Sequence, residues 1–340
     1  MQTGDLLTIN DLVVEYKTRR GTARGIDGVS LSLPCHTTLG IAGESGCGKS
    51  TLGRAIIRLV PYPGRITNGS IEFELDRDVN VPDKDPVRAG RYNLLDLNKD
   101  QMRALRGEQI AYIFQDPMTS LNPMLNIRKH YREVLKAHNP RIEDEVVTKR
   151  TEEVLDALGI SPERMNDYPH QFSGGMRQRV MIGLGLVLRP RLLIADEPTT
   201  SLDVIVEAQI LQEMARLKRD FDLTMILITH NLGVLAETAD MIAIVYAGRV
   251  VELGNTITIF EDPLHPYTKA LLDSVPDVRK PDRKLAWIPG APPELTHPIP
   301  GCMFNPRCSH AMDICREIQP PLQPDKNGSQ VACYLYQEAH

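Results

Sequence analysis

The stretch "GESGCGKST", from Gly43 to Thr51, lies between a short apolar run and an amphipathic one. It fits the pattern G-x-x-x-x-G-K-[ST], in which the backbone N–H groups of a glycine-rich loop surround a phosphate. The apolar run at Thr38–Gly43 predicts a buried strand, and the residues from Lys49 to Val60 predict a helix. This strand–loop–helix context favours a nucleotide-binding loop over a chance glycine-rich turn.

The residue types in this loop indicate how it would hold a nucleotide. We expect Lys49 to reach the outer phosphates and the Ser50 hydroxyl to bind Mg²⁺. The positive end of the following helix adds a favourable dipole. The other loop residues that we expect to contact ATP are Gly43, Glu44, Ser45, Gly46, Cys47, Gly48 and Thr51. Cys47 occupies a variable position, and we expect no separate role for its thiol.

A second acidic motif, "RLLIADEP" from Arg191 to Pro198, supplies the other half of a phosphate-transfer site. Its apolar residues predict a strand that ends at Asp196, which we expect to hold Mg²⁺ through a water molecule. Glu197 follows and should face the opposite way, where it could polarise the attacking water. An acidic helix cap after a strand is the alternative, and the phosphate loop upstream disfavours it.

The bulk composition excludes several classes of protein. The chain has 340 residues, enough for two domains or for one large domain with an appendage. Its 39 basic and 44 acidic residues give a net charge of −5, which is not typical of a nucleic-acid binder. We find no apolar run long enough to span a membrane and no signal peptide. We therefore expect a cytoplasmic protein, in which disulfides are disfavoured.

The hydrophobic pattern alternates between short buried strands and longer amphipathic helices, which is typical of α/β layering. Further expected elements are strands at 110–114, 191–196 and 224–229, a helix at 204–221 and a hairpin at 241–254 that turns at Ala247-Gly248. Residues 117–190 have a mostly helical pattern and predict a helical subdomain that interrupts the sheet. The polar stretch 75–93 is expected to be a surface insertion.

The segment "FSGGMRQR", from Phe172 to Arg179, resembles the signature of ABC-type ATPases. The usual form is LSGGQ, and this chain has Phe172 and Met176 at the first and fifth places. Four more elements of that family follow in the expected order: Tyr16 at the place of the aromatic that stacks on adenine, Gln115 as the Q-loop, Thr200–Asp203 ("TSLD") as the D-loop and His230 as the switch histidine. The resemblance covers about residues 6–255.

The resemblance implies an α/β P-loop ATPase with a RecA-like core, an antiparallel β subdomain and a helical subdomain at about 117–180. In that family ATP is held between two protomers. Ser173, Gly174, Gly175 and Met176 would approach a γ-phosphate that the partner's phosphate loop binds. Gln115 would sense the γ-phosphate and join Ser50 and Asp196 at Mg²⁺. Glu197 and His230 would be the catalytic pair, and Asp203 would belong to the D-loop. Each residue alone also has an ordinary structural explanation.

Two further segments, Phe114–Pro123 and His265–Pro276, resemble the ATPases of oligopeptide and dipeptide importers. This resemblance implies an ATP-hydrolysing subunit on the cytoplasmic face of the membrane. Its expected partners are a second, related ATPase chain in a heterodimer, two transmembrane permease subunits and an extracytoplasmic solute-binding protein. Oligosaccharides or nickel are alternative cargoes. A soluble ABC protein of DNA repair or translation is a further alternative, but neither a tandem cassette nor a long coiled-coil insertion is present.

The C-terminal region has a different composition and contains four of the six cysteines. Ten prolines lie between Pro281 and Pro324, so this region cannot build much of a core. We expect an ABC ATPase domain at 1–258 and an extension at 259–340. Cys302, Cys308, Cys315 and Cys333 are spaced C-x5-C-x6-C-x17-C and lack the close pairs of structural zinc sites. This spacing favours a [4Fe–4S] cluster.

The resemblance points to the same cluster, since relatives with this type of tail carry one. Zinc, with His310 as a possible ligand, is the first alternative, and unligated core cysteines are the second. We expect the metal centre to be structural, because the proline-rich tail lacks a core of its own. Cys35 has no evident partner in the sequence.

Overall fold

The structure, a computed structural model, describes residues 4–115, 121–199, 204–274 and 288–337. The chain divides into two compact units that are interleaved along the sequence. The first comprises 1–6, 34–37 and 72–227, and the second comprises 7–33, 38–71 and 228–340. Residues 258 and 259 both lie in the second unit, so the predicted boundary between an ATPase domain and an extension does not coincide with this division and stays a prediction.

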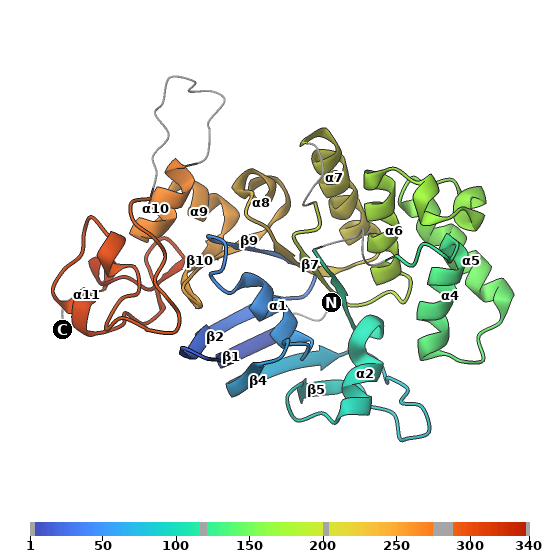
Figure 1. Cartoon of the computed structure of the whole chain (residues 1–340), viewed down its shortest axis with the longest axis horizontal. Coiled ribbons are helices and arrows are strands. Elements are labelled where there is room, and N and C mark those ends of the chain that lie inside the picture. The colour runs from blue at the N-terminus through green and yellow to red at the C-terminus, as the bar shows by residue number, and fades with distance from the viewer. Residues whose placement is uncertain (1–3, 116–120, 200–203, 275–287, 338–340) are drawn as a thin grey trace. The chain divides into compact units, whose positions relative to one another are not determined.

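In the second unit, three long strands lie side by side in the order β2, β1, β4 (Figure 1). They are β1 (Asp5–Thr18), β2 (Gly21–Pro34) and β4 (Gly64–Leu75). Apolar residues of β1 such as Leu7, Leu12 and Val14 are buried, whereas Lys17 and Thr18 at its C-terminal end are exposed. These strands correspond to the β subdomain that the family resemblance implies.

The other sheet of the second unit begins with β3 (Thr38–Ala42), which is entirely buried and runs parallel to β9 (Met241–Tyr246). β9 turns into β10 (Arg249–Asn255) through Ala247 and Gly248, which have φ values of 48° and 81°. The expected hairpin and its turn are therefore confirmed. Positive φ at both turn residues matches the twist of the flanking strands.

The C-terminal segment continues this sheet. β12 (Gln330–Val331) pairs antiparallel with β10, and β11 (Gln323–Pro324) pairs with β12. Val331 is buried in a small cluster with Leu264 and Cys333. The tail thus belongs structurally to the unit that contains the phosphate loop, rather than standing apart from it.

The helices of the second unit are short. They are α1 (Lys49–Ile56), α8 (Leu232–Thr238), α9 (Thr256–Glu261), α10 (Pro266–Asp273) and α11 (Ile314–Glu317). The sequence predicts that α1 reaches Val60, and this is wrong by four residues. The helix ends early because Arg58 adopts a left-handed conformation with φ 53°, which terminates the helical hydrogen-bond pattern.

In the first unit, the buried strands β8 (Thr224–Ile228), β7 (Leu192–Asp196) and β6 (Ile110–Ile113) are neighbours in that order. β6 and β7 are parallel, with Tyr112 opposite Ile194. The three strands expected here are confirmed to within a residue at each end. Nearly continuous apolar runs identify them, as is usual for strands covered on both faces.

The first unit also contains the helix-rich segment that the pattern of residues 117–190 predicts. Figure 1 shows α4 (Ile127–His138), α5 (Asp144–Ala157) and α6 (Gly174–Leu186) side by side. The short helices η1 (Pro162–Asn166) and η2 (Pro169–Gln171) connect α5 to α6 along the chain. Tyr131 on α4 donates a hydrogen bond to the Val180 carbonyl at 3.2 Å. Its hydroxyl fits because position 183 is glycine, where a Cβ would lie 2.1 Å away.

The helix expected at 204–221 is confirmed as α7 (Val204–Asp220). The sequence did not predict α2 (Lys99–Glu108), β5 (Gly90–Asn93) or the bridge between Val79 and Val87. β5 pairs with Glu72–Leu75 of β4. The stretch 75–93 is therefore not simply a surface insertion, since Val79, Val81 and Val87 are buried. In the described parts of the chain, no helix has the length and apolar character that crossing a membrane requires.

Candidate nucleotide-binding site

The phosphate loop owes its shape to glycines at positions where the backbone is crowded. Gly48 has φ 108°, and a Cβ there would lie 2.3 Å from the Gly25 carbonyl oxygen. Gly43 has φ 149°, and a Cβ there would lie 2.1 Å from the Val245 carbonyl oxygen. Only glycine satisfies both requirements, so the spacing of the motif follows from the close approach of neighbouring backbone.

The loop opens onto the N-terminus of α1. Gly48 is the N-cap residue, and no side chain caps the first turn of the helix. Lys49 is buried, and its Nζ donates to the carbonyl oxygens of Gly43 at 2.7 Å and Glu44 at 3.0 Å. Its ammonium group therefore lies inside the curve of the loop. A helix N-terminus with an ammonium group beside it is a favourable place for a phosphate.

Several other predicted site residues also belong to the second unit. Tyr16 comes from β1, and its hydroxyl lies 3.2 Å from Thr51 Oγ1 at the start of α1. Ser45 and Gly46 are exposed at the tip of the loop. Cys47 is buried, and this burial raises the pKa of its thiol, against the opposing effect of the nearby Lys49 ammonium. His230 is exposed and directly precedes α8, whose N-cap is Asn231.

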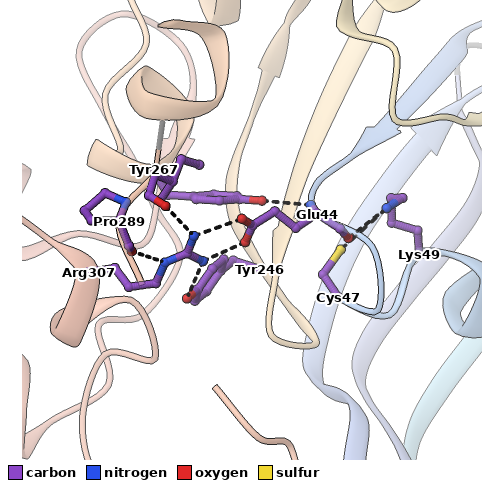
Figure 2. A network of polar contacts seen from close by, with 8 residues as sticks. Glu44, Cys47, Lys49, Tyr246, Tyr267, Pro289 and Arg307 are labelled. Carbon is purple, nitrogen blue, oxygen red and sulfur yellow. Dashed lines mark hydrogen bonds and ion pairs between the residues drawn. The ribbon is translucent and has the colours of Figure 1, made fainter. Parts of the chain in front are cut away.

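The side chain of Glu44 has partners that the sequence does not reveal. Arg307, 263 residues away, donates to both carboxylate oxygens, and the Glu44 backbone N–H donates to the Tyr267 hydroxyl. Both partners belong to the C-terminal region (Figure 2). An arginine in a proline- and cysteine-rich segment carries no periodic signal, so only the fold could identify it.

In the first unit, the acidic strand end is formed as the sequence predicts. β7 ends at Asp196, which is fully buried. The Tyr112 hydroxyl, from the neighbouring strand β6, donates to Asp196 Oδ2 at 2.7 Å. Sequence reasoning missed Tyr112. A polar-tipped aromatic in the otherwise aliphatic run "IAYIF" was the signal that could have drawn attention to it.

Glu197 directly follows β7 and has φ 47°. Gln115 Nε2 donates to Glu197 Oε2 at 2.9 Å, so two residues predicted to act near the γ-phosphate lie together. Asp196 is fully buried and Glu197 is half-buried, and the expectation that the two side chains face opposite ways stays a prediction. Glu197 adopts the left-handed region directly after the strand has ended, so strand alternation alone does not determine the direction of its side chain.

The predicted signature residues form the beginning of α6. Ser173 is the exposed N-cap, and its Oγ accepts the Met176 N–H at 3.4 Å, while Gly174 and Gly175 make the first turn. The two departures from the usual pattern both contact Arg164. Its guanidinium lies 4.3 Å from the centre of the buried Phe172 ring, and its Nη1 lies 3.4 Å from Met176 Sδ. The unusual residues therefore pack beside the Ser-Gly-Gly turn and leave it intact.

Other predicted residues cannot be placed. Asp203 and the rest of Thr200–Asp203 lie outside the described residues. The structure brings together the phosphate loop with Tyr16 in the second unit, and Gln115 with Asp196 and Glu197 in the first. Cys35, for which no partner was expected, is approached by Arg191 Nη2 at 3.6 Å from its Sγ.

One small pocket is lined by the four tail cysteines, Cys302, Cys308, Cys315 and Cys333, together with His310. All four are free thiols, and burial raises the pKa of Cys302 and of Cys333 to about 11, with smaller contributions from the neighbouring sulfur atoms. In the described part of the chain, no three His, Cys, Asp or Glu side chains are arranged to hold a metal ion. The expected metal-cluster extension is therefore not shown.

Comparison with known proteins covers nearly the whole chain. A family profile described as "ABC transporter" matches residues 26–200. A second profile, "Oligopeptide/dipeptide transporter, C-terminal region", matches residues 251–315. The two profiles therefore span the phosphate loop, the signature, the acidic strand end and most of the tail.

Full-length relatives agree with these profiles. The oligopeptide transport ATP-binding protein OppD of Bacillus subtilis is 46% identical over 93% of this chain and 85% of its own length. The dipeptide transport ATP-binding protein DppD of the same organism is 41% identical over 97% and 94%. OppD of Escherichia coli is 43% identical over 98% and 94%.

Solved structures with the same fold include MJ0796, a bacterial ABC transporter cassette described as dimeric. It has a TM-score of 0.60 and 25% identity, and the match covers 74% of this chain and 98% of that one. CbiO1 from Clostridium perfringens, part of the ABC transporter complex cbiONQ, has a TM-score of 0.60 and 25% identity over 76% and 91%. These matches confirm the P-loop ABC ATPase fold. The chain belongs to the ABC transporter family, among the ATP-binding proteins of oligopeptide and dipeptide transport.

Proposed function

We propose that this chain is the ATP-hydrolysing subunit that energises a binding-protein-dependent importer of dipeptides and oligopeptides. The observation that carries the proposal is the similarity, over 93% or more of the chain, to relatives named for oligopeptide or dipeptide transport. The match of the tail to the oligopeptide/dipeptide C-terminal region supports the same cargo. Oligosaccharides or nickel are the alternative cargoes.

We assign the predicted site residues to ATP hydrolysis. Lys49 and the loop N–H groups would hold the phosphates, and Ser50, Gln115 and Asp196 would hold Mg²⁺, whose charge offsets that of the phosphates. Glu197 would accept a proton from the attacking water, and His230 would clamp the γ-phosphate. The buried ammonium of Lys49 and the hydrogen bond from Gln115 to Glu197 support these roles.

We also propose that the chain works as half of an ATPase dimer. Ser173 and the following glycines would contact the nucleotide bound by a second, related ATPase chain, and Asp203 would contribute from the D-loop. The exposed Ser173 at the start of α6 supports a contact of this kind. Two permease subunits and an extracytoplasmic solute-binding protein would complete the machine, with this chain on the cytoplasmic face of the membrane.

A transport assay tests the cargo. The subunit, copurified with its permeases and reconstituted in liposomes, should accumulate labelled di- and oligopeptides only with ATP and the binding protein. Lys49→Ala should abolish accumulation, because the outer phosphates lose their cation. Uptake of oligosaccharides or Ni²⁺ without uptake of peptides would replace peptides as the cargo. ATPase activity without any permease copurifying would favour a soluble ABC protein instead.

For the tail, we propose that Cys302, Cys308, Cys315 and Cys333 hold a [4Fe–4S] cluster with a structural role. Four thiols around one pocket fit the donor set of such a cluster, which is wider than the site of a single ion.

Anaerobic purification followed by iron, sulfide and zinc analysis tests this proposal. A brown protein that absorbs near 400 nm, with about four irons per chain, supports the cluster. Cys308→Ser should remove the colour, whereas Cys35→Ser, which lies outside the pocket, should keep it. A colourless protein with one zinc per chain would support the zinc alternative, with His310 as a candidate ligand.

A further inference from the structure

An ion pair between Glu44 and Arg307 links the phosphate loop to the C-terminal region. Arg307 Nη1 donates to Glu44 Oε2 at 2.7 Å, and Nη2 donates to Oε1 at 2.9 Å. This is the parallel, two-bond geometry in which a guanidinium binds a carboxylate most strongly (Figure 2). Glu44 is the first residue after the glycine that opens the loop.

Arg307 is held rigidly by its own surroundings. Its side chain is only 4% exposed. Nε donates to the Pro289 carbonyl at 2.9 Å, and Nη1 reaches the Tyr246 hydroxyl at 3.3 Å, while the guanidinium lies 5.8 Å from the centre of the Tyr246 ring. A buried guanidinium with most of its donors engaged presents a fixed charge, because moving it would leave several hydrogen bonds unmade.

The same glutamate is also held through its backbone. Its N–H donates to the Tyr267 hydroxyl at 2.9 Å, and its carbonyl oxygen accepts from Lys49 Nζ at 3.0 Å. Tyr267 lies on α10 and is fully buried. The backbone N–H, the carbonyl and the side chain of one loop residue thus all have partners, two of which come from the C-terminal region.

The charge of Glu44 matters for a loop that binds phosphate. An unpaired carboxylate beside a triphosphate disfavours binding, since like charges repel. The paired guanidinium cancels that charge and also fixes where the loop begins. With Arg307 in position, the carboxylate of Glu44 carries no uncompensated charge beside the phosphate loop.

We propose that Arg307 is a positioning residue for ATP binding, through which the cysteine-containing tail controls the affinity of the phosphate loop. Arg307 directly precedes Cys308, so the order of the cysteine pocket and the place of the guanidinium depend on the same short segment. By linkage, whatever orders the tail strengthens ATP binding, and ATP binding orders the tail to the same extent. This inference rests on the proposed ATP site at the phosphate loop.

Steady-state ATPase kinetics of the full-length subunit, purified with its partners, test the inference. Arg307→Met should raise the KM for ATP about tenfold and change kcat by less than about twofold, because binding rather than chemistry is affected. Arg307→Lys should lie in between, since it keeps the charge and loses the two-bond geometry. Arg316→Met is the matched control, because this tail arginine forms an exposed pair with Asp313.

Two further variants separate positioning from simple loss of folding. Glu44→Gln combined with Arg307→Met should have a KM closer to the wild type than Arg307→Met alone, since the double variant leaves no unpaired carboxylate. Tyr267→Phe removes the hydroxyl that accepts the Glu44 N–H and leaves the pair between Glu44 and Arg307 unchanged. It should raise the KM about threefold. Metal and thiol content per chain should be measured for each variant.

Each result decides the matter. Equal KM values for Arg307→Met and Arg316→Met, or fully additive effects of Glu44→Gln and Arg307→Met, would overturn the inference. A loss of kcat with unchanged KM would indicate a purely structural arginine and would also overturn it. Lys49→Ala distinguishes the two levels of proposal: if it keeps wild-type ATP affinity, the assigned ATP site itself is wrong.

Discussion

Two glutamates occupy similar places in this chain and have different surroundings. Glu44 follows the buried strand β3, and Glu197 follows the buried strand β7. Glu44 binds the guanidinium of Arg307 through both carboxylate oxygens. Glu197 accepts a hydrogen bond from the neutral amide of Gln115 at 2.9 Å.

The difference lies in what each partner does to the charge of the carboxylate. A guanidinium that binds both oxygens cancels the charge and fixes the side chain, which suits a structural role. An amide donor orients the carboxylate without cancelling its charge, which suits a group that must accept a proton. A strand followed by glutamate is thus ambiguous in sequence, and the residue opposite the carboxylate decides its role.

The largest expected effect comes from exchanging each glutamate for glutamine. Glu197→Gln should lower kcat by about 10²–10⁴-fold with ATP still bound, since a general base is lost. Glu44→Gln should act mainly on the KM for ATP. ATPase assays together with equilibrium binding of an ATP analogue measure both. Near-normal hydrolysis by Glu197→Gln would remove the basis of the comparison.

The second effect tests the shape of the phosphate loop without nucleotide. Gly48→Ala should lower the free energy of unfolding by about 3 kcal/mol, because its Cβ would meet the Gly25 carbonyl at 2.3 Å and φ is 108°. Gly46→Ala is the matched control, since φ is 79° but no atom lies within 4 Å of a Cβ there. It should cost about 1 kcal/mol. Urea denaturation of the two variants should show this order, and the reverse order would contradict the crowded-loop explanation.

The third effect concerns the acidic strand end. Tyr112→Phe removes the hydroxyl that donates to the buried Asp196 at 2.7 Å. A lost hydrogen bond to a charged group is worth about 1.5 kcal/mol, so ATPase activity should fall about tenfold. The Mg²⁺ concentration needed for half-maximal activity should rise with it. Tyr92→Phe, on β5, is a tyrosine control away from the strand end. Unchanged Mg²⁺ dependence in Tyr112→Phe would separate Tyr112 from the metal-binding role of Asp196.

The smallest effect is a pH dependence of the tail that supports Glu44. Burial lowers the pKa of His265 to about 3, whereas histidine in an unfolded chain has a pKa near 6.5. As the pH falls through 6.5, His265 binds a proton in the unfolded state but stays neutral in the native state. The free energy of unfolding is therefore highest well above pH 6.5 and decreases as the pH falls toward 3. Between pH 7 and pH 6 the loss is about 0.7 kcal/mol.

His265 Nδ1 accepts the Tyr267 N–H at 3.0 Å at the start of α10, and asparagine can cap the helix in the same way without titrating. The stability of His265→Asn, measured by urea denaturation at pH 7 and pH 6, should therefore depend less on pH than that of the wild type. Equal pH dependence of the two proteins would show that His265 does not stay neutral in the native state.

Much of the fold was predictable because its signals are local. Buried strands such as Thr224–Ile228 are continuous apolar runs, and Gly248 in the hairpin turn adopts positive φ without steric cost. The early end of α1 was not predictable, because nothing in its apolar spacing shows that Arg58 turns left-handed. The buried valines at 79, 81 and 87 were missed since polar neighbours obscure their alternation.

The candidate site likewise has some residues that could be predicted from the sequence and others that could not. The phosphate loop, the acidic strand end and the start of α6 were located from the sequence, since each depends on consecutive residues with special backbone or chemical properties. Tyr112 and Arg307 were missed, because each acts on a residue far away in the chain. Asp203 and the binding of a metal by the four cysteines stay predictions.

The sequence by itself determined the family and the positions of the nucleotide-binding motifs, because glycine conformation, helix capping and strand burial are properties of short segments. Only the tertiary structure decided which charges meet. Arg307 reaches Glu44 across 263 residues because β12 of the tail pairs with β10, in the same unit as the phosphate loop. Electrostatic interactions depend on distance in space rather than along the chain, so no local pattern records them.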